Sequence, residues 1–258
     1  MSAYIRAIEY YLPEKILTNQ DLSDQFPEWS VADIENKTGI AGRHIAASHE
    51  FASDLAVKAV EKLFASGACS PSEIDFILYC TQSPDYLLPT TACLLQDRLG
   101  ISTTAGALDF NLGCSGYIYG LSLAKGLIET GQAKKVLLIT AETYSKFIAS
   151  NDRSVRTLFG DAAAATLIES TEKQKEIIGP FVFGTDGRGG KNLQVAGSGV
   201  RGSQESPDKN FLYMNGPEIF NFTIDAVPAA IKMLLKKANL PLDQIDLFIF
   251  HQANRYML

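Results

Sequence analysis

Cys114 stands in the stretch of this sequence best suited to covalent chemistry, the small-residue run GCSG at 113–116. Leu108 and Phe110 precede it in an apolar segment that predicts a short strand. A helical pattern follows, with apolar residues at spacings of four, three and four, namely Tyr117, Leu121, Ala124 and Ile128. The pattern predicts a strand, a tight turn and a helix that ends before Gly131, with the cysteine at the helix N-terminus.

That position suits a nucleophilic thiolate, because a helix N-terminus favours negative charge. The free backbone N–H groups there could also hold the oxyanion that forms when a thioester carbonyl is attacked. The other interpretation is a small buried hydrophobe, which most free cysteines are. The position of Cys114 alone is consistent with both interpretations, a nucleophile and a small buried hydrophobe. Under either one, Gly116 and Gly120 lie one turn apart and indicate close packing of the helix against another element.

Composition narrows the class of protein. The chain has 258 residues, 46% hydrophobic and 20% charged, which fits a globular protein of one large or two small domains. The net charge of −6 argues against nucleic-acid binding. No apolar run approaches the roughly 18 residues of a membrane span, and the N-terminus lacks a signal-peptide pattern. Four cysteines without a CxxC pair indicate a reducing cytoplasm, and three histidines do not favour a metal site.

Strands and helices alternate along the chain, which predicts α/β layers with a largely parallel sheet. The expected strands are 4–8, 74–80, 107–110, 134–142, 162–169 and 245–250. The expected helices are one near Thr18 or Asn19, then 54–67, 91–100, 116–130 and one following NGPEIFN at 215–221. Residues 170–176 are expected to be a connector and 184–210 a loop region.

Residues 26–46 are expected to form a loop with one tryptophan, Trp29, and the basic residues Lys37, Arg43 and His44. Such a loop could stack against and pair with a nucleotide. The alternative is a surface loop with a half-buried tryptophan, and the residues by themselves favour neither.

The sequence also repeats. Residues 54–80 align without gaps on 225–251 at an offset of 171, each reading as a capped helix, a polar turn and an Ile-Asp strand. The alignment places His251 where Cys80 ends its strand, at the edge where ligands of parallel sheets gather. The second copy stops at Leu258, before any counterpart of 88–168. We therefore expect the sequence to be a fragment or a shortened protein.

Several motifs occur along the chain in the following order: YLPE, TGI followed by RHIA, LPTTACLLQDRLG, DFNLGCSGYIYGLSLA, DR followed by TLFGDAAAA, and HQAN. In this combination the chain resembles the β-ketoacyl-acyl-carrier-protein synthase III family of the thiolase-like superfamily, over essentially its whole length. The resemblance implies duplicated α/β layers (αβαβα) with the second half incomplete. It divides the chain into an N-terminal half, 1–170, and a partial C-terminal half, 171–258.

The resemblance further implies a two-step reaction. Cys114 would take an acyl group from acyl-CoA, and a malonyl-acyl carrier protein would lose CO₂ and attack the acyl-enzyme. His251 matches the family's catalytic histidine, which donates a hydrogen bond to the developing enolate together with an asparagine. That asparagine lies beyond HQAN in the family, so we expect this chain alone not to complete the cycle.

Other family positions match more loosely. Lys37 corresponds to a basic residue that contacts CoA, Trp29 to the adenine-stacking tryptophan at a longer spacing, and Arg153 to an arginine near the adenine. Gly216 and Asn254 match positions near the pantetheine arm. Leu88 corresponds to a residue that closes the acyl pocket of the neighbouring subunit, where a leucine leaves room for a primer longer than acetyl.

The resemblance also suggests partners. An acidic carrier protein needs a basic patch, for which the candidates are Arg255 and the helix lysines Lys232, Lys236 and Lys237. Acyl-CoA and the acyl carrier protein are the expected partners, in a cytoplasmic homodimer without nucleic acid, membrane, metal or cofactor. Two alternatives stay open: a thiolase-fold acyltransferase that uses an alcohol, an amine or a second acyl chain, and a non-catalytic fragment that binds acyl carriers.

Overall fold

The computed structural model describes residues 1–172, 178–207 and 209–257. The chain forms two compact units. The first unit comprises Met1–Leu17, His44–Tyr144 and Gly160–Gly179, and the second comprises Thr18–Arg43, Ser145–Phe159 and Pro180–Leu258. The division into halves at residue 170 stays a prediction. Most of the connector expected at 170–176 lies outside the described residues.

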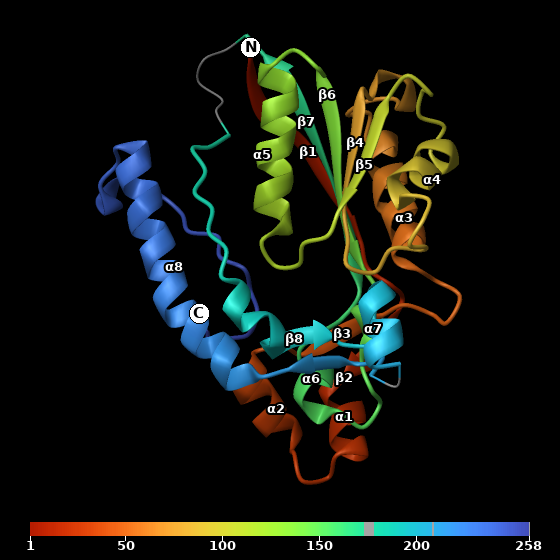
Figure 1. The fold of residues 1–258 in the computed structure, drawn as a ribbon, viewed down its shortest axis with the longest axis vertical. Coiled ribbons are helices and arrows are strands. Elements are labelled where there is room, and N and C mark those ends of the chain that lie inside the picture. The colour runs from red at the N-terminus through yellow and green to blue at the C-terminus, as the bar shows by residue number, and fades with distance from the viewer. Residues whose placement is uncertain (173–177, 208, 258) are drawn as a thin grey trace. The chain divides into compact units, whose positions relative to one another are not determined.

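A five-stranded sheet forms the centre of the first unit (Figure 1). Its order is β1-β7-β6-β4-β5, made by β1 (Ser2–Tyr11), β7 (Ala162–Thr171), β6 (Lys135–Glu142), β4 (Phe76–Cys80) and β5 (Gly106–Phe110). β4 is parallel to β5 and β6, whereas β7 is antiparallel to both β6 and β1. The sheet is therefore mixed: β1, β4, β5 and β6 run in one direction, as expected for a largely parallel sheet, and β7 runs against them. A continuous apolar run in the sequence indicates that a strand is buried on both faces, but it does not indicate the direction of the strand.

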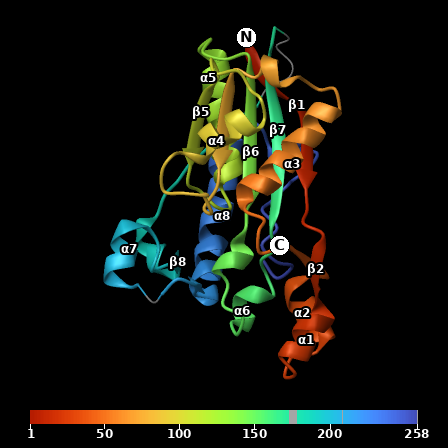
Figure 2. The same cartoon turned by 90° about the vertical axis from the view of Figure 1, so that its right-hand side faces the viewer.

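Helices cover both faces of this sheet (Figures 1 and 2). α3 (Ala52–Ala65) and α4 (Thr91–Arg98) lie on one face, and α5 (Gly116–Glu129) lies on the other. The apolar face of α3 is fully buried, including Leu55, Val60 and Leu63. Burial of each such side chain contributes about 1.5–3 kcal/mol, so this layer supplies much of the unit's stability.

The predicted helix after Cys114 is confirmed as α5, with Leu121, Ala124 and Ile128 buried. Gly131 follows it with φ +75°, the left-handed conformation expected of a residue just past a helix end. The predicted close approach is also confirmed. A Cβ at Gly120 would overlap the buried Leu138 of β6, and one at Gly116 would overlap Cys80 of β4. Small residues thus let α5 lie directly on the strands.

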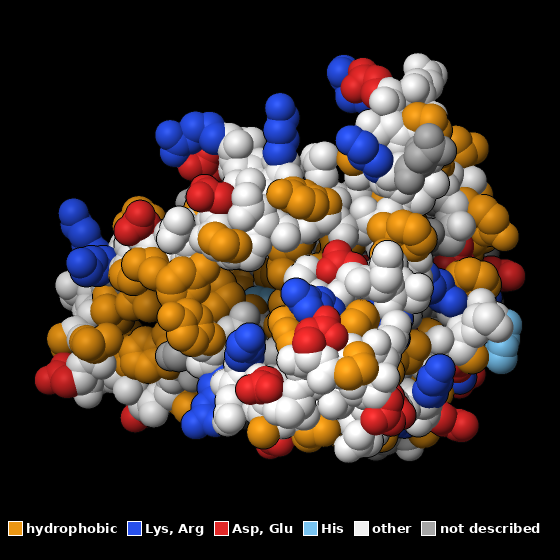
Figure 3. Space-filling view, turned by 90° about the horizontal axis from the view of Figure 1, so that it is seen from below, with side chains coloured by type: hydrophobic (Ala, Val, Ile, Leu, Met, Phe, Trp, Pro, Cys, Tyr) orange, Lys and Arg blue, Asp and Glu red, His pale blue; other side chains and the backbone are white. Residues whose placement is uncertain are grey.

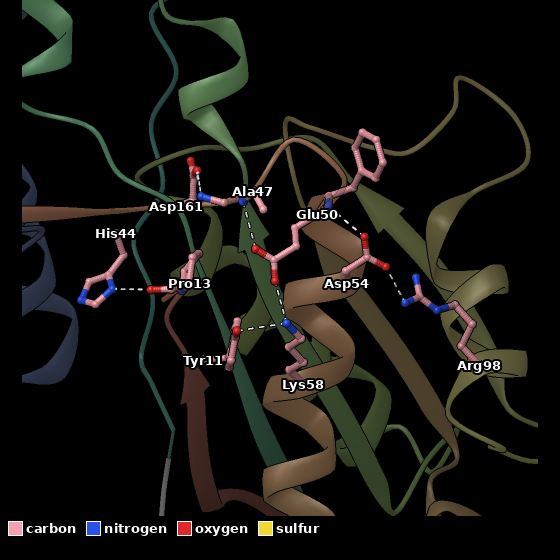
Figure 4. Close-up of polar contacts among 11 residues, drawn as sticks. Tyr11, Pro13, His44, Ala47, Glu50, Asp54, Lys58, Arg98 and Asp161 are labelled. Carbon is pink, nitrogen blue, oxygen red and sulfur yellow. Dashed lines mark hydrogen bonds and ion pairs between the residues drawn. The ribbon is translucent and has the colours of Figure 1, made fainter. Parts of the chain in front are cut away.

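Polar contacts hold the start of α3 to its neighbours (Figure 4). Lys58 Nζ lies 2.6 Å from Glu50 Oε1 and 3.0 Å from the Tyr11 hydroxyl of β1. Arg98 of α4 pairs with Asp54 at 2.7 Å. These contacts are partly exposed and contribute little free energy singly, but they fix the orientation of α3 against β1 and α4.

The second unit contains several short elements and one long helix, α8 (Gly216–Ala238). The short elements are α1 (Asn19–Gln25), α2 (Val31–Thr38), α6 (Arg153–Arg156), η3 (Gly187–Asn192), β8 (Leu193–Val195), α7 (Gly199–Glu205) and β9 (Leu212–Met214). Thr18 caps α1, as expected. The loop expected at 26–46 is wrong, because Ser30 and Asp33 form a capping box that begins α2, and Gly39 ends it. The loop expected at 184–210 is likewise interrupted by η3, β8 and α7. β2 (Lys15–Thr18) and β3 (Gly42–Ile45) pair as a two-stranded sheet.

The internal repeat is visible in local structure. Pro71–Glu73 and Leu242–Gln244 form short 3₁₀ helices (η1 and η4) at the predicted offset of 171 residues. The strand expected at 245–250 is absent from the structure, and Leu247 and Ile249 are 72% and 82% exposed. A strand needs a hydrogen-bonded neighbour, and no described strand pairs with this segment.

Many hydrophobic side chains of the second unit are exposed. None of the residues of α8 is buried, and hydrophobic side chains gather on part of the face in Figure 3, among charged ones. Among the described residues, no helix combines the length and the apolar character needed to cross a membrane.

Candidate active site

Three parallel strands of the first unit end at one edge of the sheet. Phe110 of β5 and Thr140 of β6 both lie in register with Cys80 of β4. The segments that follow these strands carry the Cys114 turn, residues 81–83 and residues 142–144. This is the edge where the sequence predicted that chemistry would gather.

Cys114 lies in the turn between β5 and α5, and its side chain is exposed. Gly116 N–H donates to Gly113 O at 2.8 Å and closes the turn. The sequence suggested that the helix N-terminus would favour the thiolate. The structure shows the opposite net effect, because desolvation raises the pKa of Cys114 and outweighs a hydrogen bond from its own backbone. The Cys114 thiol is thus exposed, but its surroundings disfavour the thiolate form.

Glu142 is the residue near Cys114 that the sequence analysis missed. Its carboxylate accepts hydrogen bonds from Gln82 N–H at 2.6 Å and from Ser83 Oγ at 2.7 Å. Burial raises its pKa to about 7 despite these bonds, and its charge in turn raises the pKa of Cys114. Gln82 continues the network, since its amide donates to Asn111 Oδ1 at 3.1 Å and accepts from the Tyr144 hydroxyl.

Three residues expected to contact CoA meet in the second unit. Lys37 Nζ lies 4.6 Å, and Arg153 Cζ 5.3 Å, from the centre of the Trp29 ring. Arg153 also pairs with Glu28, beside a cleft of about 560 Å³ lined by Phe26, Glu28, Asn151, Asp152, Arg153 and Ser154. The three residues expected to contact CoA therefore lie together.

Arg43 and His44 do not join this cluster. Arg43 is 2% exposed, and its guanidinium donates to Thr157 O and Asn19 Oδ1. His44 Nδ1 lies 2.5 Å from Pro13 O. The buried Arg43 holds the fold together, so the nucleotide-pairing role considered for it is wrong, whereas that of the half-buried His44 stays a prediction. A basic residue followed by histidine gives no sign in sequence of which side chain will be buried.

The HQAN segment belongs to the second unit. The His251 side chain is exposed, and its partial burial lowers the pKa of the imidazole, which favours the neutral form at pH 7. Asn254 Oδ1 accepts from Met257 N–H at 3.1 Å, and Arg255 N–H donates to Thr38 O at 2.8 Å. The segment is therefore fixed to the end of α2. Gly216 begins α8, and the space around its Cα is open.

The remaining predicted site residues are surface residues. Leu88 is 83% exposed in the loop before α4, in the same unit as Cys114. Lys232 and Lys236 are exposed one turn apart on α8, and Arg255 is also exposed. Lys237 donates to Phe181 O at 2.9 Å.

Comparison with known proteins decides the family. Residues 108–187 match the family model for 3-oxoacyl-[acyl-carrier-protein] synthase III. A β-ketoacyl-[acyl-carrier-protein] synthase III 2 of Halalkalibacterium halodurans is 40% identical over 99% of this chain and 76% of its own length. The chain belongs to the β-ketoacyl-acyl-carrier-protein synthase III family. A synthase III of Caldanaerobacter subterraneus is 41% identical over 95% of the chain and 74% of its own length.

Solved synthase III structures confirm the fold. A 3-oxoacyl-(acyl-carrier-protein) synthase III crystal structure superimposes with a TM-score of 0.98, at 52% identity, over all of this chain and 80% of the other. The thiolase-like α/β fold expected from the motifs is therefore confirmed, as is the enzyme class, a condensing enzyme of the acyltransferase type.

Proposed function

We propose that the full-length protein condenses an acyl-CoA primer with malonyl-acyl carrier protein and releases CO₂, with Cys114 as the nucleophile that holds the acyl group. The observation that carries the proposal is an accessible cysteine at the carboxyl edge of three parallel strands, in a turn that opens α5, in a chain of the synthase III family.

In the first step Cys114 loses its proton and its sulfur attacks the thioester carbonyl of acyl-CoA. The tetrahedral oxyanion collapses, the C–S bond to CoA breaks, and CoA leaves as a thiol once it takes up a proton. The exposed side chain gives an acyl-CoA access to the sulfur. We assign the oxyanion to backbone N–H groups of the turn at the start of α5.

In the second step the malonyl thioester loses CO₂, and the electron pair of the broken C–C bond forms an enolate. The enolate carbon attacks the acyl group on Cys114, and the sulfur leaves as thiolate and regains its proton. We assign His251 the role of N–H donor to the enolate oxygen. Its lowered pKa suits this role, because a neutral imidazole donates a hydrogen bond without carrying charge.

We further propose how substrates are held. Trp29, Lys37 and Arg153 would bind the adenine and phosphates of CoA, since an aromatic ring beside two cations suits both. Gly216 and Asn254 would lie along the pantetheine arm, and Leu88 would border the acyl pocket of a second subunit in a homodimer. Lys232, Lys236 and Arg255 would meet the acidic carrier protein. The reaction as proposed needs neither metal nor cofactor, and we place it in the cytoplasm.

The test is CO₂ release from malonyl-acyl carrier protein labelled in its free carboxyl carbon. We expect labelled CO₂ in an amount equal to the 3-oxoacyl product, and only when acyl-CoA is present. Product formed from an alcohol, an amine or a second acyl-CoA without CO₂ release would instead support an acyltransferase of the same fold. A protein that binds acyl carrier protein but forms no product would contradict the enzymatic proposal.

A further inference from the structure

Glu142 combines two properties that are unusual in one side chain: it is largely enclosed, and it faces the nucleophile turn. It comes from the end of β6, and both of its carboxylate oxygens accept hydrogen bonds from the segment after β4. Thr143 N–H also donates to Ser83 Oγ at 3.0 Å. Ser83, after β4, is therefore hydrogen-bonded to both Glu142 and Thr143 at the end of β6. Among the described residues, no Lys or Arg forms an ion pair with Glu142.

Among the described residues, the titratable groups whose ionisation the Glu142 charge opposes are all neutral or acidic. They are Tyr79 and Cys80 of β4, Cys114 of the turn, and Tyr144 beyond β6, and the carboxylate charge raises the pKa of each. A carboxylate in such surroundings has hydrogen bonds but no counter-charge. Its own ionisation and that of Cys114 therefore oppose each other.

The same residue is connected to the turn through Gln82. The backbone N–H of Gln82 donates to Glu142, while the side-chain amide of Gln82 donates to Asn111 and accepts from Tyr144. The Gln82 oxygen lies so close to Gly113 that a Cβ at Gly113 would come within 2.6 Å of it. Glu142 thus holds the backbone of Gln82, and the Gln82 side chain packs against residues 111–113, just before Cys114.

We propose that Glu142 is a positioning residue that sets the reactivity of Cys114, holding the turn through Gln82 and opposing thiolate formation by its charge. The inference deepens the proposed function and rests on Cys114 being its nucleophile. Its consequence is a thiol kept largely protonated when the site is empty. When Glu142 is itself protonated, the thiolate forms more readily.

The test is the pH dependence of Cys114 alkylation by iodoacetamide, followed by mass spectrometry of the Cys114 peptide. In the wild type we expect the rate to rise less steeply near pH 7, where Glu142 ionises, than above and below it. Glu142→Gln should remove that feature and raise the rate above pH 7 by about tenfold, equivalent to one pKa unit. The control variant Glu129→Gln, at the exposed far end of α5, should change neither the shape of the pH profile nor the alkylation rate above pH 7.

Two further measurements keep the inference testable if Glu142→Gln folds poorly. Ser83→Ala removes one hydrogen bond to the carboxylate, so it should raise the pKa of Glu142 and move the shallow region to higher pH. The inference would be overturned if the alkylation rate of the wild type followed a single ionisation across the pH range. It would also be overturned if Ser83→Ala left the pH profile unchanged. Because alkylation needs no acyl-CoA, this result is independent of acyl transfer, and failure of the proposed function would appear separately as absent acylation.

Discussion

His251→Ala is expected to separate the two steps of the reaction. Acylation of Cys114 should keep its rate within about twofold, whereas condensation with malonyl-acyl carrier protein should fall by about 10²- to 10³-fold, the usual effect of removing one donor to a developing oxyanion. The reason is that the imidazole N–H is assigned to the enolate, which exists only in the second step. Single-turnover acylation and steady-state CO₂ release would measure the two rates.

A conservative variant tests the chemistry of the histidine. His251→Asn keeps an N–H donor, so it should recover part of the condensation rate that His251→Ala loses. Equal losses of acylation and condensation in His251→Ala would contradict the assignment and indicate that the residue supports the HQAN segment instead.

Gly120→Leu is expected to destabilise the protein strongly. The new side chain would enter space filled by Leu138, which is fully buried in β6. Overpacking of this kind costs about 1–3 kcal/mol, more than the roughly 1 kcal/mol that helix propensity returns. We expect the urea midpoint to fall clearly, together with Cys114 reactivity, because α5 begins at the nucleophile turn.

The matched control lies on the same helix. Gly126 is exposed, and no atom lies within 4 Å of a Cβ built there. Gly126→Leu should therefore leave stability unchanged or raise it by up to about 1 kcal/mol through helix propensity. If both variants were equally destabilised, close packing of α5 would not be the cause.

Much of the site was predictable because it is local. Strand, turn and helix around Cys114 follow from the spacing of apolar residues and glycines within about two dozen positions. The packing of Gly116 and Gly120 could be predicted for the same reason. The meeting of Trp29, Lys37 and Arg153 was predicted through the family resemblance, since no spacing rule joins residues so far apart in sequence.

What could not be predicted depends on strand register and on missing partners. Glu142 and Gln82 are 60 residues apart and meet only because β4 and β6 are parallel neighbours. The antiparallel β7 could not be distinguished from a parallel strand by its composition. Residues 245–250 have the composition of a strand, but no described strand pairs with them, because composition cannot supply a hydrogen-bonding neighbour.

The central claim is that Cys114 carries the acyl group, and the most direct measurement is intact protein mass before and after incubation with a panel of acyl-CoAs. We predict a gain of one acyl group, kept in Cys93→Ala and lost in Cys114→Ala. Cys93 is the appropriate control because it is the other exposed cysteine among the described residues. An acyl group retained by Cys114→Ala, or no gain in the wild type with any acyl-CoA, would contradict the account.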